Sequence, residues 1–387
     1  MALPPLKAQF DALLKLPSIS CTQPALDQSN LAVVEQLASW FETLGFSCRI
    51  QPIPGQPGKA NLIAALGSGP GGLVLAGHTD TVPCNPERWQ SDPFALTEKN
   101  NRWYGLGSCD MKGFFPLIIE AVKAYADQPF KQPLIILATA DEECSMSGAR
   151  ALVEADLLGA RHAVIGEPTG MRPIRLHKGI LMERIDILGQ AGHSSDPSLG
   201  HSAMEAMHAV IGNLLQLRGD WQKRWNNPLF GVPTPTLNLG CIHGGDNPNR
   251  ICAKCALEFD IRPLPGMDSD DLRAAIRERL VPIAAEHQVQ IDYQPLFPGV
   301  PAFETADNAP IVQACETLTG YRAEAVAFAT EGPYLNQLGA QTLILGPGDI
   351  AQAHQPDEFL AMDRLQPTID VLQGLIRRFC LQHSSTD

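Results

Sequence analysis

Short apolar runs bounded by Gly, Pro and polar residues recur through the first half of the chain and again near its end. Runs of this kind are typical of strands that are buried on both faces of a sheet. We predict such strands at residues 62–66, 73–76, 134–139, 163–166 and 342–345. Segments with helical spacing lie between several of them, at residues 114–125 and 149–158. This alternation predicts an α/β fold in which helices flank a mixed, mostly parallel sheet.

Two helices are predicted before the first of these strands. Residues 6–16 form a short amphipathic pattern. Apolar residues such as Val33, Leu37 and Leu44 then recur at helical spacing. The second helix should end at Gly45, because glycine is a natural residue just beyond a helix C-terminus.

The middle of the chain has a different pattern, in which polar and apolar residues alternate. The alternation covers residues 182–188 and 251–261, with predicted helices at 202–217 and 269–287. Such strands belong to a sheet with one exposed face. We therefore expect a smaller α+β domain at residues 181–292, inserted into a larger domain built from residues 1–180 and 293–387.

Composition and charge narrow the function classes. A chain of 387 residues with 44% hydrophobic and 18% charged residues is that of a soluble globular protein with more than one domain. Its net charge of −13 repels phosphate backbones and anionic headgroups, so neither nucleic acid nor a membrane is expected as a partner. Lys7, Asp11 and Lys15 interrupt the amino-terminal apolar residues, so we expect no signal peptide and a cytoplasmic protein. Disorder is expected only at Ser384-Ser385-Thr386.

The ten cysteines are expected to be reduced, since a cytoplasmic chain rarely keeps disulfides. Cys252 and Cys255 form a C-x-x-C motif within the alternating run. Side chains three residues apart on a strand point to opposite faces, so a shared zinc ion or a disulfide is not expected there.

Residues 67–72 match the spacing G-x-G-x-x-G, which raises a dinucleotide-binding oxidoreductase as a rival class. That fingerprint must open a helix whose N-terminus receives the pyrophosphate. Here a predicted strand follows, and Pro70 interrupts the loop. We therefore interpret the segment as a hairpin turn and disfavour the oxidoreductase.

Histidines and carboxylates follow the predicted buried strands. Ligands of open α/β sheets bind at the carboxyl ends of the strands, so side chains at these ends can converge. The candidates are His78, Glu142, Glu143, Glu167 and His354, joined by Asp110 in the loop before a predicted helix. Two imidazoles with several carboxylates suit zinc, and their number fits two ions that share one carboxylate. Such a pair can hold a common water and lower its pKa, and Asp80 is placed to orient His78.

Glu142 and Glu143 are adjacent, which ordinarily indicates a solvated charged turn. The preceding strand is apolar, and hydrolysis requires a base, so we expect one carboxylate to bind metal while the other moves the proton. Thiol hydrolysis at Cys109 or Cys144 is disfavoured, because neither has an evident base of its own. A binding protein that has lost catalysis is also disfavoured, because such a protein usually lacks a ligand or the base, whereas all six candidate residues are present here.

Four ordered motifs make the chain recognisable. They are Gly77-His78-Thr79-Asp80, Asp110-Met111-Lys112-Gly113, Asp141-Glu142-Glu143 and Gly166-Glu167-Pro168-Thr169. Together they resemble the two-zinc aminoacylase and carboxypeptidase family. Later segments resemble the bacterial members that deacetylate N-acetylornithine in arginine biosynthesis. These segments are Gly192-His193-Ser194-Ser195, Asn249-Arg250-Ile251, Asp260-Ile261-Arg262 and Ala353-His354-Gln355-Pro356-Asp357-Glu358.

The resemblance implies a zinc-peptidase-like catalytic domain, with residues 181–292 as a dimerisation and lid domain of a homodimer. It implies that His78 and Glu167 hold one Zn²⁺ and that Glu143 and His354 hold the other, with Asp110 as the bridge, Glu142 as the general base and Co²⁺ as a substitute metal.

By the same resemblance, His193 crosses the dimer interface to stabilise the oxyanion. Arg250 and Arg262 are expected to grip a substrate carboxylate, and Thr330 and Glu331 to line the substrate pocket. The substrate is a small N-acyl amino acid. Succinyl-diaminopimelate, acetylcitrulline, other acetylated amino acids and dipeptides remain open beside N-acetylornithine.

Overall fold

The computed structural model describes residues 3–382, so the expected disorder at Ser384-Ser385-Thr386 lies outside the described residues. The chain divides into two compact units. The first contains the described residues up to Arg175, together with Thr305–Glu324 and the described residues from Thr330 onward. The second contains Leu176–Glu304 and Ala325–Ala329, so the predicted insertion at residues 181–292 lies inside it.

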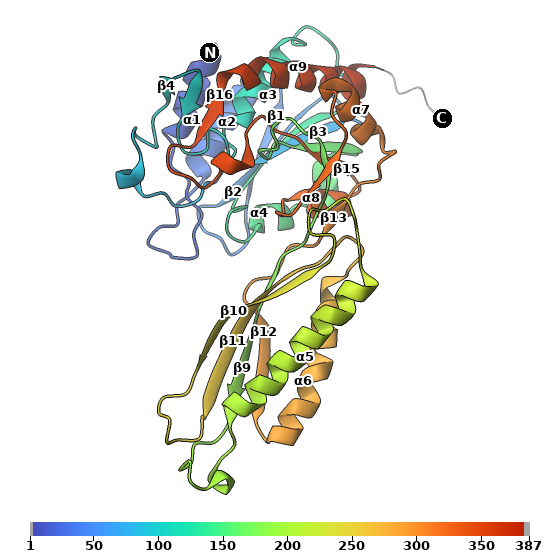
Figure 1. Cartoon of the computed structure of the whole chain (residues 1–387). Helices are drawn as coiled ribbons and strands as arrows, with labels where there is room; N and C mark the ends of the chain where they lie inside the picture. Colours follow the sequence, from blue (N-terminus) through green and yellow to red (C-terminus); the bar gives the residue numbers. More distant parts are fainter. Residues whose placement is uncertain (1–2, 383–387) are drawn as a thin grey trace. The chain divides into compact units, whose positions relative to one another are not determined.

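The first unit is built on a mixed sheet with the strand order β1-β2-β6-β3-β7-β15 (Figure 1). The bounds are β1 Ser47–Pro52, β2 Ala60–Leu66, β3 Leu73–His78, β6 Leu134–Thr139, β7 His162–Ile165 and β15 Gln341–Ile344. β3 pairs in parallel with β6 and β7, and β15 pairs in parallel with β7, whereas β2 is antiparallel to β1 and β6. The order continues through the short strands β8 (Ile174–His177) and β13 (Phe303–Glu304), with β14 (Glu324–Val326) paired to β8. The predicted fold class is confirmed.

Both faces of the central strands are buried, which explains their unbroken apolar runs. Every residue of β3 and β6 is buried. Leu73 and Leu75 pack into one core, while Val74 and Ala76, on the opposite face, pack into another. The first core lies under the helices α1 (Leu6–Leu14), α2 (Leu31–Thr43), α3 (Phe114–Lys123), α7 (Pro310–Thr319) and α9 (Leu365–Ile376). The second lies under α8 (Gly332–Gln337) and the segment around Leu152 and Leu157.

Two local predictions are wrong. The helix expected at residues 149–158 is instead a short helix, α4 (Ser147–Arg150), followed by a separate 3-10 turn, Glu154–Leu157. The turn is held by the Asp156 carboxylate, which accepts the Val153 N–H at 2.9 Å and pairs with Arg49. Residues 67–72 do not form a hairpin turn, because β6 lies between β2 and β3. They do lead into a strand rather than a helix, as predicted.

The second unit is a four-stranded antiparallel sheet, in the order β10-β11-β9-β12, covered on one face by two helices that lie side by side (Figure 1). The strands are β9 Leu181–Leu188, β10 Thr236–Gly244, β11 Lys254–Arg262 and β12 Gln290–Pro295, and the helices are α5 Ala203–Arg224 and α6 Ser269–His287. Buried and more exposed residues alternate along β9, as the sequence pattern predicts. Ser202 and Asp268 cap the two helices by accepting backbone N–H groups.

Two features of the second unit differ from prediction. The first helix extends beyond the predicted end at Leu217 to Arg224. The strand predicted from residue 251 starts at Lys254, so Cys252 precedes β11 while Cys255 lies on it. Both thiols are free, as are the other eight cysteines.

A small three-stranded sheet in the first unit supports one of the functional loops. It has the order β16-β5-β4, with β16 Phe359–Ala361, β5 Arg102–Tyr104 and β4 Thr97–Lys99. The loop after Tyr104 leads to Asp110 and then to α3. Among the described residues, no helix combines the length and the apolar composition needed to cross a bilayer.

Candidate metal centre

The carboxyl ends of three parallel strands bring the first candidate ligands together. His78 is the last residue of β3 and is in register with Thr139, the last residue of β6. Glu167 follows β7, the neighbour of β3 on the other side. His78 and Glu167 are buried, with 0% and 6% of their surfaces exposed. The strand-end rule therefore explains why residues distant in the sequence lie close together.

Two groups of potential ligands meet at Asp110. His78, Asp110 and Glu167 form one group, and Asp110, Glu143 and His354 form the other; within each group the ligand atoms lie within 4.8 Å of one another. His78 Nε2 is 3.0 Å from Asp110 Oδ1, whereas His354 Nε2 is 3.6 Å from Asp110 Oδ2. The two oxygens of one carboxylate thus face different groups. All five ligands predicted from the sequence lie in this cluster.

The cluster has the chemistry of a cation site. Burial, and then the charge of nearby carboxylates, raises the pKa of Glu143 and Glu167. Glu167 Oε1 is buried and has no hydrogen-bond partner. Divalent cations bound by these carboxylates and imidazole nitrogens would relieve both the repulsion and the missing contact. The residues therefore fit the two metal ions expected from the sequence.

The orientation of His78 leaves the correct nitrogen for a metal. Its Nδ1 lies 3.0 Å from the carbonyl oxygen of Asp80 and 3.6 Å from the Asp80 carboxylate. A carbonyl oxygen only accepts, so the ring carries a proton on Nδ1. Nε2, 3.0 Å from Asp110 Oδ1, is then the nitrogen that would bind a cation shared with that carboxylate. Asp80 thus orients the ring, mainly through its backbone.

The carboxylate of Asp80 also accepts hydrogen bonds from the turn that follows β6. Its Oδ1 accepts the N–H of Glu142 at 3.2 Å and its Oδ2 accepts the N–H of Glu143 at 3.1 Å. Asp80 is fully buried. Burial alone would raise its pKa, but hydrogen bonding to His78 and to backbone N–H groups lowers the pKa overall. An ionised Asp80 therefore fixes the backbone that carries the two adjacent glutamates.

The adjacent glutamates do not form a solvated charged turn. Glu143 lies 3.0 Å from His354 Nε2, while Glu142 groups with His78 and Glu143. Burial and the nearby charge of Glu167 raise the pKa of Glu142 well above its ordinary value. A carboxylate in this setting takes up a proton more readily than an exposed one, which suits a general base.

Thr330 and Glu331 lie in the same unit as the metal cluster. Glu331 Oε2 accepts the hydroxyl of Thr139 at 2.8 Å, which places Glu331 at the carboxyl end of β6. Its Oε1 is buried without a hydrogen-bond partner. Burial raises the pKa of Glu331 to about 7. Thr330 accepts the N–H of Gly332 at 3.1 Å.

One buried residue near the site has no role in the sequence prediction. Glu358 lies four residues after His354 and accepts backbone N–H groups from the loop that carries Asp110. Burial raises the pKa of Glu358 to about 8, although these donors favour the charged form. Glu358 ends the segment 353–358 that carries the resemblance, but the sequence predicted no role for it, because its partners are main-chain groups.

His193, Arg250 and Arg262 belong to the second unit. The exposed His193 ring contacts Ser195 Oγ at 2.7 Å, and a backbone bridge joins His193 to Arg250. Arg250 pairs with Asp246 at 2.8 Å, and Arg262 pairs with Asp260 at 2.9 Å. Both guanidinium groups therefore already have carboxylate partners.

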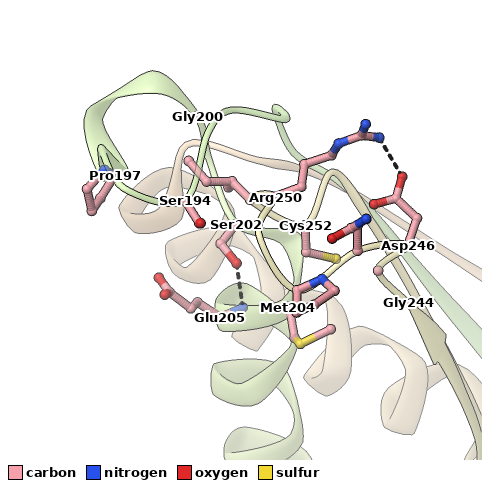
Figure 2. A pocket seen from close by; sticks show the side chains of 14 residues that line it. Ser194, Pro197, Gly200, Ser202, Met204, Glu205, Gly244, Asp246, Arg250 and Cys252 are labelled. Carbon is pink, nitrogen blue, oxygen red and sulfur yellow. Dashed lines mark hydrogen bonds and ion pairs between the residues drawn. The ribbon is translucent and has the colours of Figure 1, made fainter.

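Arg250 also lines a pocket of about 620 Å³ in the second unit. Figure 2 shows its guanidinium directed to Asp246, with Ser194 and Gly200 on the neighbouring loop. The pocket is formed by the segment after His193, the start of α5 and the segment from the end of β10 toward β11.

Comparisons with known proteins agree with the motifs. Residues 74–378 match peptidase family M20/M25/M40. The chain is 51% identical over 378 residues to an acetylornithine deacetylase of Edwardsiella ictaluri (strain 93-146), covering 98% of each protein.

Solved structures share the fold. Aminopeptidase PepT from Bacillus cereus ATCC 10987 has a TM-score of 0.76 and 19% identity, covering 96% of this chain and 97% of that one. The YXEP protein of Bacillus subtilis, described as a dinuclear metal-binding peptidase of the M20 family, has a TM-score of 0.66 and 16% identity, covering 96% of each chain. The resemblance predicted from the motifs is confirmed: the chain belongs to peptidase family M20/M25/M40 and is a metal-dependent hydrolase.

Proposed function

We propose that this protein hydrolyses the amide of N-α-acetylornithine to ornithine and acetate, as a cytoplasmic homodimer acting in arginine biosynthesis. The observation that carries the proposal is the position of Asp110 between two ligand groups, with Glu142 beside them. The choice of substrate is supported by the 51% identity to an acetylornithine deacetylase over nearly the whole chain.

The proposed centre holds two Zn²⁺ per subunit, which Co²⁺ can replace. His78 and Glu167 would hold one ion, Glu143 and His354 the other, and Asp110 both. When bound, such a pair polarises the amide carbonyl and lowers the pKa of a water molecule. Residues 1–180 and 293–387 form the proposed catalytic domain around this centre.

Glu142 is the proposed general base. It takes a proton from the attacking water as the water oxygen bonds to the acetyl carbon. It then donates that proton to the ornithine nitrogen as the carbon–nitrogen bond breaks, so that acetate and the free amino acid leave. The raised pKa of the half-buried Glu142 supports both steps, because the protonated form must persist between them.

His193 is proposed to reach the active site of the partner subunit and to donate a hydrogen bond to the developing oxyanion. The N–H of Ser195 donates to His193 Nδ1 at 3.2 Å. A neutral ring that accepts at Nδ1 carries its proton on Nε2, which leaves Nε2–H available as the donor. Residues 181–292 are accordingly the proposed dimerisation and lid domain.

Substrate recognition is proposed to use Arg250 or Arg262 together with Thr330 and Glu331. A substrate carboxylate would take the place of the Asp246 carboxylate as the partner of Arg250, or of the Asp260 carboxylate as the partner of Arg262. A guanidinium group can bind a carboxylate in bidentate fashion. Thr330 and Glu331 are proposed to line the pocket for the substrate side chain. The unpartnered Oε1 of Glu331 suits the cationic amine of ornithine.

Related substrates are the alternatives to N-acetylornithine. Succinyl-diaminopimelate carries its extra carboxylate on the acyl group and has a zwitterionic side-chain terminus, whereas acetylcitrulline has a neutral side chain. The charge preference of the pocket therefore separates both from the cationic N-acetylornithine. A dinucleotide-binding oxidoreductase remains disfavoured, because residues 67–72 lead into the strand β3.

The test is a panel assay with the zinc-loaded enzyme and the Glu142→Gln variant. N-acetylornithine should be hydrolysed with the highest kcat/KM among acetylated amino acids, succinyl-diaminopimelate and dipeptides. Glu142→Gln should bind two zinc ions and lose about 10²- to 10⁴-fold in kcat, the usual contribution of a general base. Preference for another amide would overturn the substrate, and a fully active Glu142→Gln variant would overturn the mechanism.

A further inference from the structure

The carboxylate of Glu358 is almost completely buried, with 1% of the residue exposed, and it accepts hydrogen bonds from main-chain donors. Its Oε1 accepts the N–H groups of Gly107 at 3.1 Å, Cys109 at 2.8 Å and Asp110 at 2.9 Å. Oε2 is also 3.1 Å from the Gly107 nitrogen. Three backbone donors of one loop thus converge on a single side chain.

The backbone around Glu358 holds the same loop at its start. The Glu358 carbonyl oxygen accepts the N–H of Gly105 at 3.0 Å. The next residues form β16, which pairs with β5 immediately before the loop, with Phe359 opposite Tyr104. Backbone pairing therefore fixes where the loop begins, and the side chain fixes where it ends, at Asp110.

The shape of the loop depends on this arrangement. Gly107 has a φ of +83°, and a Cβ at this position would lie 2.7 Å from Cε of Lys112. The fully buried Lys112 donates its Nζ to the carbonyl oxygens of Leu13 and Leu16, which anchors the chain just beyond Asp110. The loop itself is part of neither the main sheet nor a helix, so it depends on such contacts for its shape.

We propose that Glu358 is a positioning residue that sets the place of the bridging carboxylate, Asp110, relative to His354. The inference rests on the proposed metal centre. Asp110 must present one oxygen to each ligand group, so a small displacement of its backbone disturbs both. Since Glu358 lies four residues after His354, the same short segment carries one ligand and holds the loop of another.

If Glu358 only stabilised the fold, losing any buried carboxylate of this unit should affect metal binding to the same extent. A control carboxylate away from the ligands separates that role from a positioning role. The Asp156 carboxylate in the same unit is buried, accepts a backbone N–H and pairs with Arg49, but contacts none of the proposed ligands in any hydrogen bond or ion pair of the described residues. Asp156→Asn is therefore the matched control for the loss of a buried carboxylate.

The experiment measures metal binding and the Co²⁺ absorption spectrum as well as activity. Glu358→Met keeps the length of the side chain but removes the acceptor. Glu358→Asp keeps the charge but withdraws the carboxylate by about 1.5 Å, one carbon–carbon bond. Glu358→Gln keeps both the length and one acceptor oxygen. Metal affinity should fall about 10- to 100-fold in the Met and Asp variants, as for other partners of metal ligands.

The Met and Asp variants should also show altered Co²⁺ absorption bands and a lower kcat with little change in KM. Glu358→Gln should retain most of the affinity, and Asp156→Asn should bind metal like the wild type. If Glu358→Met does not fold, Glu358→Asp decides the question. A folded Met or Asp variant with wild-type affinity and spectrum would overturn the positioning role. Absence of metal binding by the wild-type protein would instead overturn the proposed function.

Discussion

Replacing Asp80 by asparagine tests how the site holds its general base. The Asp80 carboxylate accepts the N–H of Glu142 on one oxygen and the N–H of Glu143 on the other. Asparagine has the same shape but only one acceptor oxygen, and its amide group would face the second N–H as a donor. One of these two backbone N–H groups therefore loses its partner inside the protein.

The structure sets the size of the effect. A buried donor left without a partner costs about 1–3 kcal/mol, so the free energy of unfolding of the metal-free protein should fall by about that amount. Displacing the backbone of Glu142 and Glu143 should also lower kcat and metal affinity about 10- to 100-fold each. At about 1.4 kcal/mol per tenfold change, each loss taken singly is similar in size to the cost of the missing hydrogen bond.

Urea denaturation, kcat measurements and chelator competition would measure the three quantities on one preparation of Asp80→Asn. Asp141→Asn is the matched control in the same turn, because the Asp141 carboxylate accepts the hydroxyls of Ser145 and Ser147. Hydroxyl groups rotate and can both donate and accept, so they adapt to an amide. A folded Asp80→Asn protein with wild-type turnover and wild-type metal affinity would refute the reasoning.

Three further predictions follow from the same structure. Dialysis against a chelator should abolish hydrolysis, and activity should return only at about two Zn²⁺ or Co²⁺ per subunit; full recovery with one ion would contradict the paired centre. Mixed Glu142→Ala and His193→Ala chains should regain about a quarter of wild-type activity, because half of the dimers then contain one complete site. No recovery after verified subunit exchange would place both groups in one chain. Burial lowers the pKa of His162 from 6.5 to about 4, so its contribution to stability is full above pH 6.5 and is lost as the pH falls toward 4. His162→Gln should flatten this pH dependence of the free energy of unfolding, measured by urea denaturation, by about 1–2 kcal/mol after solvent screening; an unchanged dependence would contradict it.

The strands of the first unit could be predicted because their burial is local and extreme. The run at residues 134–139 is buried throughout, and the structure forms a strand with the same bounds. The helix Ser269–His287 was also predictable, since Asp268 caps its start. The order of the strands was not predictable in the same way. Residues 67–72 resemble a hairpin in the sequence, but β6, which comes later in the chain, pairs between the strands they connect.

The metal ligands could be proposed from the sequence because each follows a buried strand or opens a helix. The residues that hold those ligands could not be ranked in the same way. The sequence placed Asp80 beside His78 but did not predict that its carboxylate also holds the segment of Glu142 and Glu143. Glu358 is an acid in a polar segment and could have been an exposed side chain. Their partners are backbone N–H groups, which every residue except proline has, and only the folded chain reveals which of them are shared.

Asp80 and Glu358 act on the site in the same physical way. Asp80 holds the segment of Glu142 and Glu143, and Glu358 holds the loop of Asp110, in each case through backbone N–H groups. The ligand-bearing segments are turns and loops, so these buried anions replace the support that a helix or strand would give. Changes at either residue should therefore shift stability and metal affinity together. A change at Glu142 should instead lower kcat with metal affinity retained, because its side chain moves the proton and holds no segment in place.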